Sequence, residues 1–331
     1  MQESLNNISK VLAAKKFGLW LRGMLRKETG LGQELFKWEI GPSEFRMLPR
    51  QGARLMSWDL RLSGNQKRSV IFWPEEADQE NIAYVHGGNP ILFPFSARTF
   101  HKGTIKTWKS PDGEIREMPI HGFARTSKFE VVSVDDSSIS MALNSTSETK
   151  ICYPFDFEFL VTYRFDMLAL EVEFKVSNLG EAKLPWSAGH HFYFSLPWHK
   201  QLLRENYRIL LPGCKSVYQA EDGSLAPAEF KGGEASMDDS TLVGRMHFRL
   251  KENKIRFGLK SGEEDIVVVV SDAAKPLPEK TVVTWTESGD SPFYCIEPWM
   301  GPPNSPEHKT GLHWIEPGES DNFKIRISLE E

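Results

Sequence analysis

Histidines, a carboxylate, an arginine and aromatic rings recur in five short motifs of this chain. The motifs are Gly88–Arg98 (GNPILFPFSAR), His121–Arg125 (HGFAR), His190–Leu196 (HHFYFSL), Asp238-Asp239 and Glu297–Asn304 (EPWMGPPN). A histidine titrates close to neutral pH, and burial turns a carboxylate into a stronger base. Aromatic faces can stack on the C–H faces of a sugar. This set of side chains suits the movement of protons on and off the hydroxyl groups of a carbohydrate.

Glu297 is a candidate base because it directly follows the apolar run Phe293–Ile296. Partial burial at the end of such a strand would raise the pKa of the carboxyl. The turn that follows, with Pro302 and Pro303, would hold the next segment rigidly and leave Trp299 at the rim. A carboxylate at a strand end can equally pair with an arginine, and the local sequence leaves both interpretations open.

His190 and His191 begin a strand-like run in which successive side chains point to opposite faces. One histidine could therefore face a cleft while the other points away from it. The two cannot bind one metal ion from a regular strand, and no neighbouring Cys or Asp supplies metal-ligand spacing, so no metal site is expected. His121 lies between strand-like runs, and Gly122 would leave space beside its imidazole.

Two arginines flank these motifs. Arg98 ends an apolar segment interrupted by prolines, where a guanidinium can fork onto a hydroxyl or a carboxylate. Arg125 fits a salt bridge better. Taken singly, each of these histidines and arginines also fits a purely structural role.

Strand signals dominate from about Phe36 to the end of the chain. Short β-branched and aromatic runs alternate with Gly, Pro, Asn and Asp turns, and the clearest runs are 158–165, 168–176, 266–271, 280–286, 292–296 and 322–329. Residues 168–176 alternate as a strand with one solvated face does, whereas 266–270 are apolar throughout, as in a strand covered on both faces. No long helical pattern interrupts them, so residues 36–331 are expected to form one large antiparallel β-sandwich, an all-β fold. Residues 74–88 and 220–240 are polar enough to be loops over a site.

The first 35 residues differ from the rest. Apolar residues recur at roughly helical spacing between Leu5 and Leu25, basic residues lie among them, and Gly30 and Gly32 could end a helix. We therefore expect residues 1–35 to form a short helical extension, packed on the main domain or on a neighbouring subunit. A basic helix on anionic lipid and a disordered arm are the alternatives.

Composition excludes several classes of protein. A formal net charge of −5 argues against nucleic-acid binding. Three scattered cysteines are too few for a disulfide framework or a zinc cluster and are expected to be reduced. No signal peptide or membrane span is recognisable, so the cytoplasm is the expected location. Phosphate loops, nucleotide-binding glycine fingerprints and nucleophilic serine motifs are missing.

Taken together and in this order, the five motifs resemble those of the aldose 1-epimerase (mutarotase) superfamily. The most specific parts are Asn89–Arg98 followed by His121–Arg125, and Glu297-Pro-Trp with its Pro-Pro-Asn. The resemblance begins at about Phe36 and implies the galactose mutarotase-like β-sandwich, or supersandwich. It also implies an isomerase that interconverts the α and β anomers of a hexose and needs no metal or organic cofactor.

The resemblance also assigns roles to residues. Glu297 matches the general base, and His191 matches the general acid because the family pattern His-x-Tyr-Phe-x-Leu begins there. His121 matches a second active-site histidine. The expected substrate-binding residues are Arg98, Asp239 (with Asp238 next to it), Asn89, Trp299 and Phe123.

Two alternatives remain open. A hexose 6-phosphate could be the substrate if a basic cluster gathers at the cleft rim, for which Arg125, Lys102 and Lys106 are the candidates beyond Arg98. The fold could also serve as a sugar-binding module without turnover, although a matched acid and base argues against this. His190, Ser195, Phe95 and Phe129 depart from the residues common in the family, which could change sugar selectivity.

Overall fold

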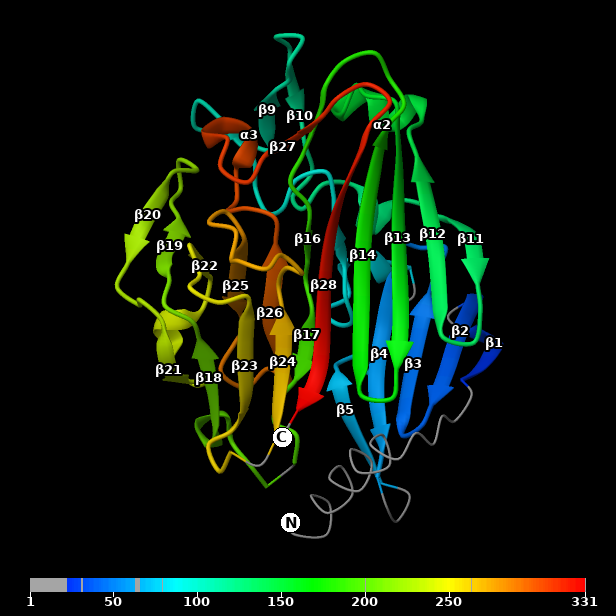
Figure 1. The fold of residues 1–331 in the computed structure, drawn as a ribbon, viewed down its shortest axis with the longest axis vertical. Helices are drawn as coiled ribbons and strands as arrows, with labels where there is room; N and C mark the ends of the chain where they lie inside the picture. The colour runs from blue at the N-terminus through cyan, green and yellow to red at the C-terminus, as the bar shows by residue number, and fades with distance from the viewer. Residues whose placement is uncertain are drawn as a thin grey trace.

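Two large antiparallel sheets make up the fold (Figure 1). The computed structural model describes residues 23–30, 32–62, 66–78, 80–199, 201–262 and 264–330. Within them, a 13-stranded sheet has the order β1 (Met24–Gly30), β2 (Gln33–Ile40), β3 (Ser43–Leu48), β4 (Arg54–Arg61), β5 (Lys67–Ile71), β17 (Tyr193–Ser195), β26 (Phe293–Trp299), β25 (Thr281–Trp285), β22 (Arg245–Phe248), β19 (Lys215–Gln219) and β20 (Leu225–Ala228), with β16 (Gly189–His190) and β6 (Ile91–Leu92) branching from β26.

The second sheet has nine strands within the described residues. Its order is β11 (Glu130–Val134), β12 (Ser138–Asn144), β13 (Phe157–Asp166), β14 (Ala169–Asn178), β28 (Ser320–Glu330), β24 (Asp265–Val269), β23 (Lys254–Leu259), β18 (Tyr207–Leu211) and β21 (Gly233–Ser236). The C-terminal strand β28, red in Figure 1, lies at its centre between β14 and β24. The predicted all-β sandwich is therefore confirmed.

Small elements connect the two sheets. Three two-stranded pairs join β7 (Phe100–His101) to β8 (Thr104–Ile105), β9 (Thr107–Lys109) to β10 (Ile115–Glu117), and β15 (Leu184–Trp186) to β27 (His313–Ile315). Short helices are α2 (Ser147–Cys152) and α3 (Ser305–His308), with single 3₁₀ turns η2 (Ile82–Tyr84), η3 (Ala124–Thr126), η4 (Arg204–Asn206) and η5 (Ser240–Leu242). No helix within the described residues has the length and apolar character to cross a membrane.

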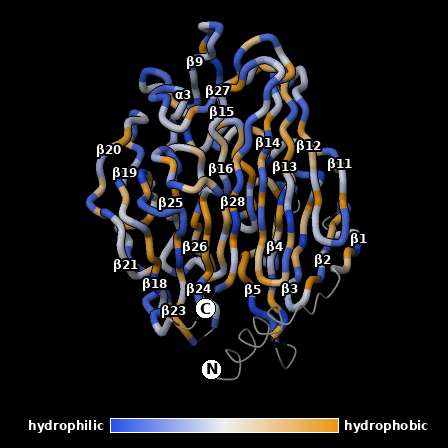
Figure 2. The backbone as a smooth tube through the Cα atoms, in the orientation of Figure 1, coloured by the Kyte–Doolittle hydropathy of each residue, from blue (hydrophilic) through white to orange (hydrophobic). Residues whose placement is uncertain are grey.

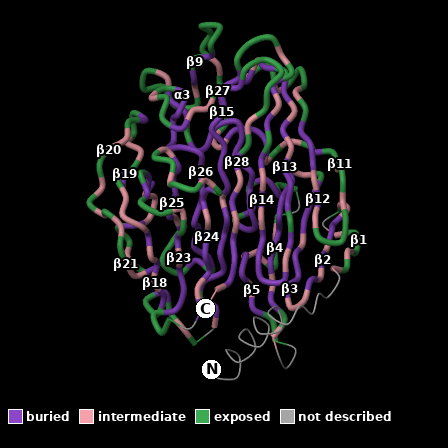
Figure 3. Tube along the Cα trace, in the orientation of Figure 1, coloured by how far each residue is buried: buried purple, intermediate pink, exposed green. Residues whose placement is uncertain are grey.

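The alternation of side chains along the strands explains why the sheets stack. On β14, Leu170, Val172 and Phe174 are fully buried, while the intervening glutamates carry ion pairs to Arg164 and Lys324. Hydrophobic and hydrophilic segments alternate in the same way along the neighbouring strands (Figure 2). The buried faces meet in one core, and exposed residues concentrate at the strand ends and loops (Figure 3). β24 is buried on both faces at its centre, as its apolar sequence predicted.

The predicted helical extension is wrong for residues 24–30 and 33–35, which form strands. β1 pairs with β2 in a hairpin, from Met24 opposite Glu39 to Gly30 opposite Gln33. Leu25 packs against the core, whereas Lys27 covers the Phe36 ring at 4.7 Å. Cross-strand pairing therefore determined the local structure where the apolar spacing favoured a helix. Residues 1–22 and 31 of the predicted extension lie outside the described residues.

Candidate active site

A cavity of about 590 Å³ opens on the face of the 13-stranded sheet that is turned away from the second sheet. On β26, Glu297 and Trp299 line this cavity, whereas Tyr294 and Ile296 join the core between the sheets. On β17, Tyr193 lines the cavity, and Phe194 packs in the core against Phe257 of β23. The strand alternation therefore divides β26 and β17 into a core face and a site face. The volume falls in the range of roughly 300–1,000 Å³ typical of small-molecule sites.

The cavity brings together residues that are far apart in the sequence. Its lining is Ala83, Tyr84, Val85, His86, Pro90, Ala97, Arg98, Ile120, His121, Arg125, His191, Tyr193, Gln219, Gly244, Met246, Val283, Trp285, Glu297 and Trp299. Five residues expected in the site are therefore present: Glu297, His191, His121, Arg98 and Trp299. The loop predicted over residues 74–88 contributes, while residues 220–240 do not.

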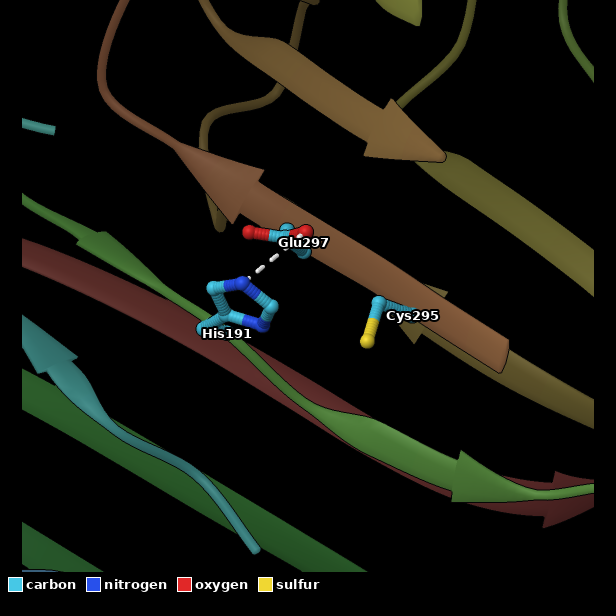
Figure 4. Close-up of side chains that lie close together, drawn as sticks. All are labelled: His191, Cys295 and Glu297. Atoms are coloured by element: carbon cyan, nitrogen blue, oxygen red, sulfur yellow. Dashed lines mark ion pairs between the residues drawn. The ribbon is translucent and has the colours of Figure 1, made fainter. Parts of the chain in front are cut away.

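Glu297 and His191 form a pair at the buried end of this cavity (Figure 4). The Nε2 of His191 lies 3.5 Å from the Oε1 of Glu297, and their side chains are 12% and 2% exposed. Burial raises the pKa of Glu297 well above its ordinary value and lowers that of His191 well below it. Burial therefore disfavours the charged form of each group. The Oε2 of Glu297 has no hydrogen-bond partner among the described residues.

His191 is held firmly, although it lies between β16 and β17 rather than within a strand. Its backbone N–H donates to Asn89 Oδ1 at 3.0 Å. Its ring stacks on Tyr193, with 4.8 Å between centroids, and meets the edge of Trp285. These contacts aim the imidazole at Glu297. The expected continuous strand from His190 is interrupted here, and the carbonyl of His190 accepts a bond from Trp299 Nε1 at 3.0 Å.

His190 points away from the cavity, as the alternation of the motif predicted for one of the two histidines. It is fully buried and packs on Phe174, with ring centroids 4.1 Å apart. Its Nδ1 accepts a bond from Asn89 Nδ2 at 3.1 Å. His190 therefore belongs to the core between the sheets.

Asn89 is hydrogen-bonded to both His190 and His191 on the side away from the cavity. It is fully buried, and its Nδ2 also donates to the hydroxyl of Tyr163 at 3.1 Å. Because it does not line the cavity, its predicted role in substrate binding is corrected to one of positioning.

His121 presents a neutral N–H group to the cavity. Its Nδ1 accepts a bond from the Ala97 N–H at 3.1 Å, so the ring proton of the neutral form lies on Nε2. Burial, with Arg125 and Arg98 nearby, lowers the pKa of His121 to about 3. The ring approaches His191 at 5.5 Å and Trp299 at 6.3 Å. His121 therefore suits hydrogen-bond donation better than proton transfer.

Gly122 is required by close packing of the chain against the Phe93 segment. Its φ is +70°, and a Cβ at this position would lie 1.9 Å from the carbonyl oxygen of Phe93. The glycine lets the His121 segment lie directly against the Phe93 segment.

Two arginines give the cavity a positive lining. Arg98 is exposed, and the half-buried Arg125 lies over the Tyr84 ring at 5.0 Å. In the part of the chain that the structure describes, neither guanidinium forms an ion pair, so the salt bridge expected for Arg125 is not observed. Glu297 is the one carboxylate among the described lining residues. Lys102 and Lys106 do not line the cavity.

Asp239 and Phe123 serve the fold instead of the cavity. The Oδ1 of Asp239 accepts bonds from the N–H and hydroxyl of Thr241 at 2.8 and 2.7 Å, which caps η5. Neither Asp239 nor Asp238 lines the cavity. Phe123 is buried against Phe93, edge to face at 5.8 Å. Both predicted substrate contacts are therefore corrected. The Asp239 carboxylate accepts the bonds of a local cap, and the Phe123 ring is buried in the apolar core.

The sequence analysis did not select several lining residues, among them Tyr193, Trp285, Tyr84 and His86. A signal was available for Tyr193, because residues two apart on a strand share a face and Tyr193 follows His191 by two. Trp285 could have been found only from the register that places β25 beside β26, with Trp285 opposite Cys295.

Arg54 fixes the loop that carries Tyr84 and His86. Its guanidinium is buried and donates to the carbonyls of Ile82, Ala83, Val85 and Gly87 at 3.3, 3.5, 2.6 and 2.6 Å. Burial lowers the pKa of Arg54 to about 10, which leaves it charged at neutral pH. The loop is therefore held through its backbone.

Comparison with known proteins supports the resemblance that the motifs suggested. The family model described as aldose 1-epimerase matches residues 47–328. The chain belongs to the aldose 1-epimerase family.

Relatives within and around the family are distant. The chromosomal Protein LacX of Lactococcus lactis subsp. lactis is 26% identical over 243 residues, which are 68% of this chain and 77% of LacX. A protein of Escherichia coli (strain K12), provisionally named a glucose-6-phosphate 1-epimerase, is 26% identical over 150 residues, 44% of this chain and 43% of its own. The crystal structure of a galactose mutarotase-like protein from Clostridium acetobutylicum superposes with a TM-score of 0.76 at 19% identity, covering 94% of this chain and 99% of that one. That likeness shows the galactose mutarotase-like fold of this aldose 1-epimerase family member.

Proposed function

We propose that the protein is an aldose 1-epimerase that interconverts the α and β anomers of a hexose, with Glu297 as base and His191 as acid. The observation that carries this proposal is the pair itself. A carboxylate and an imidazole lie 3.5 Å apart in a cavity of sugar-binding size. The anomeric hydroxyl oxygen and the ring oxygen of a pyranose are both bonded to C1, so closely spaced groups can act on both.

Ring opening and closure use both members of the pair in proton transfer. Glu297 as carboxylate takes the proton of the anomeric hydroxyl, while His191 as imidazolium gives a proton to the ring oxygen. The bond between C1 and the ring oxygen breaks, and C1 becomes an aldehyde. Rotation about C1–C2 presents the other face, and the same steps in reverse close the ring. The cycle needs one transferable proton on the pair, which His191 carries while Glu297 is a carboxylate.

The neighbouring residues would bind the sugar. His121 would donate from Nε2 to a hydroxyl, since its Nδ1 is occupied by the Ala97 N–H. The indoles of Trp299 and Trp285 supply apolar surface for the C–H face of the ring. Arg98 would donate to hydroxyls at the open side. Each group of the acid–base pair is expected to contribute ~10²–10⁴-fold to the rate.

Anomer exchange measured by NMR tests the proposal. Purified protein would be offered glucose, galactose and glucose 6-phosphate in parallel, with the Glu297→Gln variant as the matched control. We expect exchange faster than the spontaneous rate with at least one sugar, lost by ~10²–10⁴-fold in the variant, which still binds sugar. Retained turnover in Glu297→Gln would reject Glu297 as the base. Sugar binding without any acceleration in the wild type would instead support a binding module.

A phosphorylated hexose is the second candidate substrate. The supporting observation is that Arg98 and Arg125 line the cavity without ion-pair partners in the described residues, while the single lining carboxylate is held toward its neutral form by burial. Unpaired guanidinium groups favour a phosphate. The parallel measurement with glucose 6-phosphate distinguishes the two substrates directly.

A further inference from the structure

A third metal-binding side chain lies beside the pair of Glu297 and His191. Cys295 precedes Glu297 by two residues on β26, so both side chains lie on the same face of the strand (Figure 4). The Sγ of Cys295, a ring nitrogen of His191 and a carboxylate oxygen of Glu297 all lie within 4.8 Å of one another. Thiolate, imidazole and carboxylate are the donor types of protein zinc sites.

Two buried polar atoms of this trio have no hydrogen-bond partner among the described residues, although Trp299 also interacts with the Glu297 carboxyl. The two atoms are the Oε2 of Glu297 and the Nδ1 of His191. Cys295 is fully buried and not in a disulfide. A buried carboxylate oxygen without a donor is costly, and a cation bound between the three groups would satisfy it. The cavity supplies a path of entry, because Glu297 and His191 line it.

We propose that Cys295, His191 and Glu297 together bind a thiophilic divalent cation, Zn²⁺, and that the bound ion reversibly inhibits the epimerase, an inference that rests on the proposed function. The metal would take the lone pair of His191 and the carboxylate of Glu297. Neither group could then exchange a proton with a sugar. Water from the cavity would complete the coordination.

The geometry favours reversible binding over a resident ion. Zinc–ligand bonds of about 2.0–2.3 Å place neighbouring tetrahedral donors about 3.6 Å apart, whereas the donors here are spread over as much as 4.8 Å. The trio must therefore contract to bind the ion. If His191 binds through the Nε2 that faces Glu297, its Nδ1 lacks the outer acceptor that orients histidines in most metal sites. The thiol proton of Cys295 and any proton on the Glu297 carboxyl must also be released.

Binding is tested with Co²⁺ as a spectroscopic substitute for Zn²⁺. Wild-type protein titrated with Co²⁺ should gain the thiolate-to-cobalt charge-transfer band, and added Zn²⁺ should remove it. Cys295→Ser should abolish the band. A Cys152→Ser, Cys214→Ser double variant is the matched control and should retain it, because these are the chain's other two thiols. Absence of the band in the wild type, or its persistence in Cys295→Ser, would overturn the proposed site.

Inhibition is tested in the anomer-exchange assay. Zn²⁺ should suppress wild-type turnover, and EDTA should restore it. Cys295→Ser should keep its basal turnover but need about tenfold or more Zn²⁺ for the same inhibition. Equal inhibition of both proteins, or activation by Zn²⁺, would reject the proposal. If no sugar is turned over at all, the proposed function fails, while the Co²⁺ titration still decides whether the metal site exists.

Discussion

The imidazole of His191 lies almost parallel to the phenol ring of Tyr193, with 4.8 Å between the centroids and 10° between the planes. The stack fixes the plane of the imidazole, and the bond from the His191 N–H to Asn89 Oδ1 fixes its backbone. Neighbouring His190 does not line the cavity, because its ring packs on Phe174 in the core. Two adjacent histidines therefore have separate tasks, which mutations can distinguish.

His191→Asn should lower kcat by ~10²–10⁴-fold, since the proposed proton donor is removed. His190→Asn should leave kcat within a few-fold of wild type but lower the free energy of unfolding by about 1–3 kcal/mol, because a buried ring is lost from the core. Anomer exchange and urea unfolding of both variants measure these effects. The reverse order of kcat losses would show that the acid is misassigned by one residue.

Asn89→Ala should reduce both stability and turnover without changing a cavity-lining residue. The amide satisfies His191 N–H, His190 Nδ1 and the Tyr163 hydroxyl. Each group left unpaired in the core costs roughly 1–3 kcal/mol. We expect a fall in kcat with little change in KM, because His191 loses its orientation while the sugar contacts remain. A KM effect alone would contradict a positioning role.

Arg125→Met and Arg98→Met should separate the two candidate substrates. If a phosphate is recognised, the KM for glucose 6-phosphate should rise by tenfold or more, about 1.4 kcal/mol or above, while the KM for glucose changes little. Lys106→Met is a control, since Lys106 lies outside the cavity lining. Equal effects on both sugars would argue for a neutral hexose as the substrate.

Stability should fall as the pH drops from 6.5 toward 3. Burial lowers the pKa of His121 to about 3 and that of His247 to about 4, and it also lowers the pKa values of His190 and His191. The unfolded chain binds protons at these sites below about pH 6.5, whereas the folded state does not. The stabilisation is therefore complete above pH 6.5 and is lost on acidification.

For His121 alone, the loss at pH 5 amounts to about 2 kcal/mol. Glu297 and Asp59 act in the opposite direction, because burial raises their pKa values and so favours the folded state at lower pH, but four histidines oppose these two carboxyls. Urea unfolding at pH 7.5 and pH 5 measures the difference, and His121→Asn should shrink it. Equal unfolding free energies at the two pH values would show that these histidines ionise in the folded state.

How far the sequence could predict this protein depended on the kind of residue. Strand alternation was sufficient for the sandwich, whereas the site roles of Glu297 and His191 came from the family resemblance of the motifs, because the local sequence left a structural role open for each. Asn89 and Phe123 belong to the same motifs yet support the site from the core. A motif records which residues occur together, and it does not distinguish a residue that touches the cavity from one that packs beneath it.

Loops and edges were harder to predict. Asp239 was placed in the site although its carboxylate caps the following 3₁₀ turn, a preference that depends on local backbone geometry. Residues 24–30 were included in the predicted helical extension, whose apolar spacing ends at Leu25, but they pair with the backbone of β2. For residues 24–30, the deciding contact is with a strand whose position is known only once the chain is folded.

Arg54 binds residues 82–87 through hydrogen bonds to four backbone carbonyl oxygens and to no side chain of that loop. Every amino acid carries a carbonyl, so Tyr84 and His86 can be exchanged while this anchor stays intact. The loop is therefore a natural place to redesign sugar preference. Libraries randomised at position 84 would vary the wall of the cavity, whereas changes at position 86 would also reach Tyr193 and Trp285, which contact His191.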